Sequence, residues 1–164
     1  MASTVTTSRA ASIVGIGYEG LRTYLKRGLL GSSGVMPPFV GKDAPAPDMS
    51  VVRATWKRFG FTDLCLMHLA KQLIHLGLSF DQANSLVSNE HMRSLFREGA
   101  LKEDALVMCR PPYHDFILLK GEERGNLPDW LRESNGIAIL IELNSIAKTV
   151  TSKLQEIDRD AQSS

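Results

Sequence analysis

The sequence predicts a mainly helical, α+β fold that carries a small β-hairpin and ends in a C-terminal helix. Apolar residues recur at helical spacing through much of residues 6–98, whereas the short apolar runs typical of strands are concentrated after residue 104. The 164 residues, 43% of them hydrophobic and 23% charged, suit one globular domain or a small domain with an appendage. Four prolines and three glycines lie in residues 31–50, so a long loop is expected there.

Two short helices are expected near the N-terminus. Thr6 or Thr7 can cap the first one, and Gly15 and Gly17 end it. Its apolar residues are Ala10, Ala11, Ile13 and Val14. The second helix lies between Gly17 and Gly28, with an apolar face of Tyr18, Leu21, Tyr24 and Leu25 and a remainder that holds Arg22, Lys26 and Arg27. Two short helices joined by a glycine-bearing turn are typical of the helix-turn-helix motif, whose second helix enters the DNA major groove.

Residues 51–98 are expected to form an extended segment followed by helices. Residues 51–59 have the composition of a strand, and Thr62 or Asp63 can then cap a long helix that ends at Gly77. The apolar stripe of this helix consists of Leu64, Leu66, Met67, Leu69, Leu73, Ile74 and Leu76. Ser79 caps the next helix, which residues 90–98 can extend.

The C-terminal third is expected to contain strands and a final helix. Residues 105–110 and 113–120 indicate two short strands around a turn, and residues 121–130 indicate a polar loop. Residues 137–143 form either a third strand or the start of a helix. We favour a strand, with Asn144 as the cap of a helix whose apolar residues are Ile146, Val150, Leu154 and Ile157.

Charge is distributed unevenly along the chain. Residues 1–60 contain eight Lys/Arg against three acidic residues, a balance of +5, whereas residues 61–164 contain eleven against fifteen, a balance of −4. A polyanionic partner would therefore be bound by the N-terminal third.

Several classes of protein are disfavoured. No apolar run approaches the roughly 18 residues that span a membrane. The N-terminal residues resemble a weak transit peptide, but a frayed tail leading into the first helix is favoured, and Cys65 and Cys109 fit a reducing cytoplasm. None of the four histidines has a carboxylate or cysteine at ligand or triad spacing, so we expect no enzyme, metal site or cofactor.

Three groups of residues occur in a diagnostic order. The first is Leu21-Arg22-Thr23-Tyr24 followed by Gly28-Leu29-Leu30; the second is Trp56-Lys57-Arg58-Phe59 followed by Asp63-Leu64; the third is Leu76-Gly77-Leu78-Ser79. In this order and spacing they resemble the recognition helix, wing and following helices of the MerR family of winged-helix transcriptional regulators. The resemblance covers about residues 6–88.

The resemblance implies a winged helix-turn-helix domain over residues 1–88, with loop 31–50 inside it. Residues 89–164 are then expected to form a C-terminal hairpin and helix, the candidate dimerisation region. The resemblance further implies a sequence-specific regulator that reads the major groove with helix 17–28 and the DNA backbone with a wing at residues 51–59. The expected DNA contacts are Tyr18, Glu19, Arg22, Thr23, Tyr24 and Lys26 from the helix and Trp56, Lys57, Arg58 and Phe59 from the wing. An arginine in such a helix can bond guanine O6 and N7 with both arms, while basic wing residues contact phosphates. Packing in the core is the favoured alternative for Tyr24, as for Leu21 and Leu25, and packing within the wing is the alternative for Trp56 and Phe59.

The resemblance also implies double-stranded DNA, a second copy of the chain and RNA polymerase as partners. Ile146, Val150, Leu154 and Ile157 are the candidates for contacts in a homodimer, although docking into the chain's own core is equally open. The chain departs from the family pattern in the 25 residues between Leu30 and Trp56 and in the hairpin after residue 104. The alternative function is a protein-binding adaptor, or a DNA-bending accessory factor, on the same scaffold.

Overall fold

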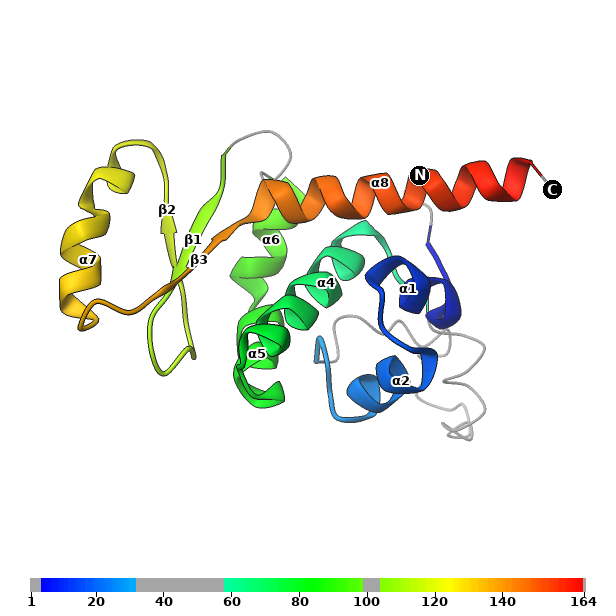
Figure 1. The fold of residues 1–164 in the computed structure, drawn as a ribbon, viewed down its shortest axis with the longest axis horizontal. Helices are drawn as coiled ribbons and strands as arrows, with labels where there is room; N and C mark the ends of the chain where they lie inside the picture. Colours follow the sequence, from blue (N-terminus) through cyan, green and yellow to red (C-terminus); the bar gives the residue numbers. More distant parts are fainter. Residues whose placement is uncertain (1–3, 32–57, 99–103, 164) are drawn as a thin grey trace, which may run out of the picture.

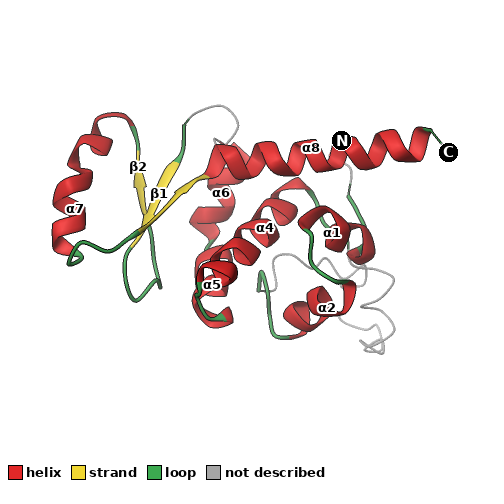
Figure 2. Ribbon diagram, in the orientation of Figure 1, coloured by secondary structure: helices red, strands yellow, loops and turns green. Residues whose placement is uncertain are grey.

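The computed structural model describes residues 4–31, 58–98 and 104–163. A body of helices formed by the N-terminal half adjoins a small antiparallel sheet with a short helix beside it, and one long C-terminal helix runs from the sheet across the body (Figure 1). Colouring by secondary structure shows that helix dominates (Figure 2). The predicted α+β class, mainly helical with a small sheet, is therefore confirmed.

The two N-terminal helices, α1 (Thr7–Val14) and α2 (Tyr18–Lys26), lie where they were predicted. Thr6 is the N-cap of α1, and its Oγ1 accepts a hydrogen bond from the Arg9 amide at 3.3 Å. Gly15 ends α1 at φ 77°, in the left-handed region that favours glycine. Three residues therefore suffice to turn the chain from α1 into α2.

Three further helices complete the body: α4 (Phe61–Leu76), α5 (Phe80–Val87) and α6 (Glu90–Glu98). The N-cap of α4 is Gly60, two or three residues earlier than predicted, because Asp63 acts from inside the first turn and accepts the Gly60 amide at 2.9 Å. Gly77 ends α4 at φ 113°, and Ser79 caps α5 as predicted.

The sheet has the order β2-β1-β3, with both neighbours antiparallel to the central strand. The strands are β1 (Leu106–Cys109), β2 (Ile117–Leu119) and β3 (Ile139–Glu142), so all three predicted strands are confirmed. Side chains alternate between the two faces. Val107 and Cys109 join the main core, whereas Met108 and Leu119 are buried outside that cluster.

The prediction of a polar loop for residues 121–130 is wrong. The segment folds as the 3₁₀-helix η1 (Gly121–Asn126) and the helix α7 (Leu127–Glu133), which lies beside the sheet (Figure 1). Pro128 occupies the first turn of α7, where its missing amide costs no hydrogen bond. Within this polar segment, Pro128 therefore marks a helix start.

The long helix α8 (Leu143–Gln162) packs on α4 and α1, which ties the C-terminal part of the chain to the N-terminal helices (Figure 1). Ile146 and Val150 are buried in the core, and Leu154 and Ile157 pack against it. Docking into the chain's own core, the alternative role for these residues, is therefore what Ile146 and Val150 do, whereas Leu154 and Ile157 keep part of their surface exposed. Dimer contacts through Ile146 and Val150 are thus corrected to core positions.

Asn144 does not cap α8, whose N-cap is Glu142. Its buried Oδ1 instead accepts the amide of Ala105 at 2.9 Å, at the start of the sheet. Among the described residues, no helix is long and apolar enough to cross a membrane.

Candidate nucleic-acid interface

The helix α2 has one buried and one exposed face. Leu21 and Leu25 are buried against the core. Tyr24 is half-buried and stacks on Phe80 of α5, with ring centroids 5.4 Å apart and planes 16° from parallel. Tyr24 is therefore used for packing, which is the alternative role that its position on the apolar face allowed.

The opposite face of α2 is polar and open to solvent. The predicted contact residues on it are Tyr18, Glu19, Thr23 and Lys26, all exposed, and Arg22, whose side chain is 31% exposed. Arg22 Nη1 lies 3.3 Å from Glu19 Oε1, and its guanidinium lies 5.7 Å from the centroid of the Tyr18 ring. Because the Glu19 side chain is 80% exposed, this ion pair is weak and can open at little cost when another acceptor approaches.

The turn that follows α2 is fixed by a residue that sequence reasoning missed. Asn84 of α5 donates from Nδ2 to the Gly28 carbonyl at 3.0 Å and accepts the Leu30 amide on Oδ1 at 3.0 Å. Gly28 adopts its positive φ of 96° without strain, but Leu30 has a φ of 66°, which is costly for a residue with a side chain, so this turn needs support from outside. The available signal was an asparagine beside Ala83 on the inward face of α5, where an unpaired amide would be costly.

The contact between α2 and α5 is completed by a cation–π pair. The Arg27 guanidinium lies 4.1 Å from the centroid of the Phe80 ring. Phe80 therefore contacts both Tyr24 and Arg27, so the C-terminal end of α2 is attached to α5 through one aromatic ring.

The residues predicted for the wing divide into three groups. Trp56 and Lys57, like most of residues 51–59 and loop 31–50, lie outside the described residues. Arg58 is exposed and donates to Thr4 twice, from Nε to Oγ1 at 3.0 Å and from Nη2 to the carbonyl at 2.9 Å. Phe59 has no exposed surface and forms an antiparallel bridge with Val5, so its predicted DNA contact is corrected to a core position.

The start of α4 is anchored by an ion pair that also escaped prediction. Asp63 Oδ1 lies 2.8 Å from Arg93 Nη1 of α6, and the two side chains are only 14% and 11% exposed. The same carboxylate accepts the Gly60 amide through Oδ2. One side chain thus caps α4, fixes α6 and holds the segment that leads from Arg58 into the body.

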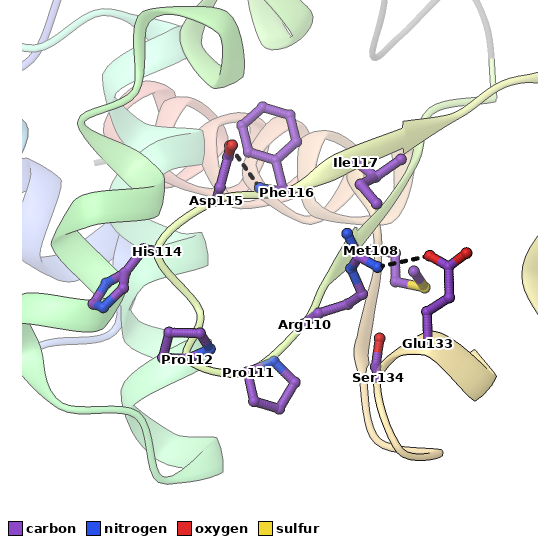
Figure 3. Close-up of a pocket in the computed structure, with 10 residues that line it drawn as sticks. All are labelled: Met108, Arg110, Pro111, Pro112, His114, Asp115, Phe116, Ile117, Glu133 and Ser134. Atoms are coloured by element: carbon purple, nitrogen blue, oxygen red, sulfur yellow. Dashed lines mark hydrogen bonds and ion pairs between the residues drawn. The ribbon is translucent and has the colours of Figure 1, made fainter. Parts of the chain in front are cut away.

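A second concave site lies at the other end of the molecule, between the β1–β2 turn and the end of α7 (Figure 3). Its volume is about 300 Å³, and Arg110 and Glu133 meet across it at 3.3 Å. Asp115 is turned to its own backbone, where Oδ1 accepts the Phe116 amide at 2.8 Å. The pocket therefore offers a paired cation and anion and little free charge.

Both cysteines of the chain are buried. Burial raises the pKa of the Cys109 thiol to about 12, with the Asp115 carboxylate adding to the rise, and burial raises the pKa of Cys65 to about 12 as well. Both thiols therefore stay protonated and unreactive at neutral pH. Within residues 4–31, 58–98 and 104–163, no three His, Cys, Asp or Glu side chains are grouped to hold a metal ion.

Comparisons with known proteins assign no family. No family model matches the chain, and no curated protein matches it significantly. The evidence for function is therefore the chain's own chemistry, and the exposed face of α2 is its most specific feature.

Proposed function

We propose that this protein is a sequence-specific DNA-binding transcriptional regulator of the MerR type, which reads the major groove with α2. The observation that carries the proposal is the exposed face of α2, with Arg22, Thr23 and Lys26 set on a helix whose other face is buried. A major groove about 12 Å wide admits one α-helix, and side chains on its outward face meet the base edges. The positive balance of residues 1–60 supports a polyanionic partner.

In this proposal the guanidinium of Arg22 leaves its ion pair with Glu19 and binds the edge of a DNA base. The guanidinium is already held over Tyr18 and beside Glu19, so little side-chain freedom is lost on binding. Guanine presents O6 and N7 as two acceptors that match the two arms of arginine, and such a contact discriminates by about 1–3 kcal/mol. Glu19, released from Arg22, is then positioned to accept from a cytosine amino group.

The proposal extends to the backbone contacts and the assembly. Lys57 and Arg58, with Trp56 beside them, would bind phosphates and contribute salt-dependent affinity without sequence preference. A cytoplasmic homodimer that engages RNA polymerase at promoter DNA completes it. Because Ile146 and Val150 are buried, the dimer would use another surface, and light scattering after size-exclusion chromatography measures whether it forms.

The decisive experiment compares two arginines in matched settings. Arg22 and Arg132 each form an exposed ion pair with an acid three residues earlier, at 3.3 and 3.2 Å. Selection from a random DNA library should yield a consensus site. We expect Arg22→Ala to lower affinity for that site by about 10-fold or more and to relax one base position, while Arg132→Ala leaves both unchanged. A library that yields no enriched sequence at low salt would reject the proposal.

The alternative of a protein-binding adaptor is favoured by one observation. Leu140 on β3 is 47% exposed, and Ile137 just before the strand is 60% exposed. The strand β3 belongs to the sheet region, which lies away from α2 (Figure 1). Exposed apolar side chains on an edge strand are typical of sites where another chain adds to a sheet. If a Leu140→Lys variant binds DNA with the affinity and the steep salt dependence of the wild type, Leu140 takes no part in DNA binding. A protein partner bound at β3 would then act separately from DNA. Binding and bending of DNA without an effect on transcription would select the accessory-factor version.

A further inference from the structure

A surface hollow of about 430 Å³ lies between residues 4–6, the helix α1 and Arg58, which directly precedes the residue that bridges Val5. Two apolar side chains belong to its wall: Val5, and Ile157 from α8. The remaining lining residues are all hydroxyl-bearing or basic: Thr4, Thr6, Ser8, Arg9, Ser12 and Arg58. No carboxylate belongs to this described lining. The hollow is therefore rich in hydrogen-bond donors and positively charged.

Arg58 enters the hollow in a fixed conformation. Its Nε and Nη2 donate to the side chain and carbonyl of Thr4, and the two amide–carbonyl bonds between Val5 and Phe59, both 2.9 Å, hold the two backbone segments together. The remaining nitrogen, Nη1, donates to none of the described residues. The conformational cost of ordering this long side chain has therefore been met before any ligand arrives.

Arg9 contributes a second cation to the hollow. Its guanidinium makes no hydrogen bond or ion pair with the part of the chain that the structure describes, although its own amide bonds to Thr6. Ser8 and Ser12 are exposed on α1 beside it, so two hydroxyl groups accompany the guanidinium along the same wall. Two arginines without an acid in one concave site repel each other, and an anion between them would relieve that repulsion.

We propose that this hollow binds a phosphate group. Guanidinium groups match phosphate oxygens with paired hydrogen bonds, and serine and threonine hydroxyls are common additional donors to phosphate. The phosphate can belong to the DNA backbone, in which case the inference rests on the proposed function, or to a phosphorylated small molecule. Binding of the group itself depends on neither source.

The first test uses inorganic phosphate as the probe on the full chain. Titration with phosphate against chloride at constant ionic strength, read by thermal unfolding and amide chemical shifts, should give a saturable shift centred on residues 4–12 and 58. Arg9→Gln should weaken that binding by about 10-fold or more, because the variant removes a charge-assisted hydrogen bond to the phosphate. Arg9 supports no described contact through its side chain, so this variant should fold normally. Arg132→Gln is the control, and equal responses from the control, the variant and the wild type would overturn the site.

The second test identifies the source of the phosphate. If it is the DNA backbone, Arg9→Gln should weaken binding to all sequences alike and lower the slope of log K against log salt by about 0.9, while the base preference set by Arg22 is kept. If Arg9→Gln weakens phosphate binding but leaves the affinity for DNA unchanged, the site takes a small phosphorylated molecule. Phosphate binding by a protein that binds no DNA would reject the proposed function and leave this site standing. If Arg9→Gln binds both phosphate and DNA as tightly as the wild type does, the site is rejected.

Discussion

The two ends of the molecule use arginine in different ways. In the sheet region and the helices that lead to it, each of the five described arginines from 93 to 132 lies in an ion pair with a carboxylate: Arg93, Arg97, Arg110, Arg124 and Arg132. Near the N-terminus, Arg9, Arg27 and Arg58 have no carboxylate partner among the described residues. Paired arginines add little net field, whereas those without an acid leave a positive potential around α1 and α2.

This difference separates stability from binding. An arginine buried with its acid contributes to folding, since removing either partner strands the other charge. An exposed arginine whose side chain contacts no other described residue, as with Arg9, contributes almost nothing to folding. The predictions below test this division, from the largest expected effect on stability to the smallest.

The largest effect is expected at the buried pair of Asp63 and Arg93. Arg93→Ala leaves the carboxylate nearly buried without its cation, so we expect the free energy of unfolding to fall by about 3–5 kcal/mol. Urea unfolding followed by circular dichroism measures this. Arg97→Ala, which breaks an exposed pair with Glu90 on the same helix, should cost less than about 1 kcal/mol and is the control. Similar losses in the two variants would contradict the division.

A smaller loss is expected from Asn84→Ala. The variant leaves the Gly28 carbonyl and the Leu30 amide without their side-chain partner, and an unsatisfied part-buried group costs about 1–3 kcal/mol. We expect unfolding to become easier by about 2 kcal/mol, with faster amide exchange in residues 27–31. Gln155→Ala, on an exposed face of α8, is the control. Unchanged exchange in the turn would mean that Asn84 does not hold it.

Local patterns explain which elements the sequence could predict. Thr6, Ser79 and Gly77 act on their own helices, and strands β1–β3 have apolar runs, so each was recognisable within a few residues. The errors occur where the partner is remote along the chain. Phe59 bridges Val5, 54 positions earlier, and no local pattern indicates that pairing.

The same reasoning applies to the missed contacts and the missed helix. Asn144 bonds to Ala105 across 39 positions and Asn84 to Gly28 across 56, so each looked like an ordinary polar residue. The helix α7 has little apolar periodicity of its own. It gains support from Arg110, which lies over Trp130 at 5.5 Å and pairs with Glu133. Of the candidate site, the exposed face of α2 was predictable, but the isolation of Arg9 was not.

A modest pH effect is expected at His68. Burial, and then the positive charge of Lys71, lowers the pKa of this histidine below its usual 6.5. The unfolded chain therefore binds a proton at a higher pH than the folded one, and stability should decline as pH falls through 6.5 toward the lower folded value. His68→Gln should lose less stability than the wild type between pH 7.5 and 5.5 in urea unfolding. An identical decline in both proteins would assign the effect to other groups.

The smallest effects on stability are expected at the exposed arginines, where the division is most strictly tested. Arg22→Ala and Arg132→Ala each remove an exposed ion pair with an acid three residues earlier, so both should change the free energy of unfolding by less than about 0.5 kcal/mol. Arg9→Ala removes no side-chain contact with a described residue, so it should change the free energy of unfolding as little. Since the three variants fold equally well, any difference in DNA affinity between them reports directly on contact with the ligand. A loss of stability above about 1 kcal/mol in Arg22→Ala alone would instead make Arg22 a structural residue and remove the basis for reading α2 as the recognition helix.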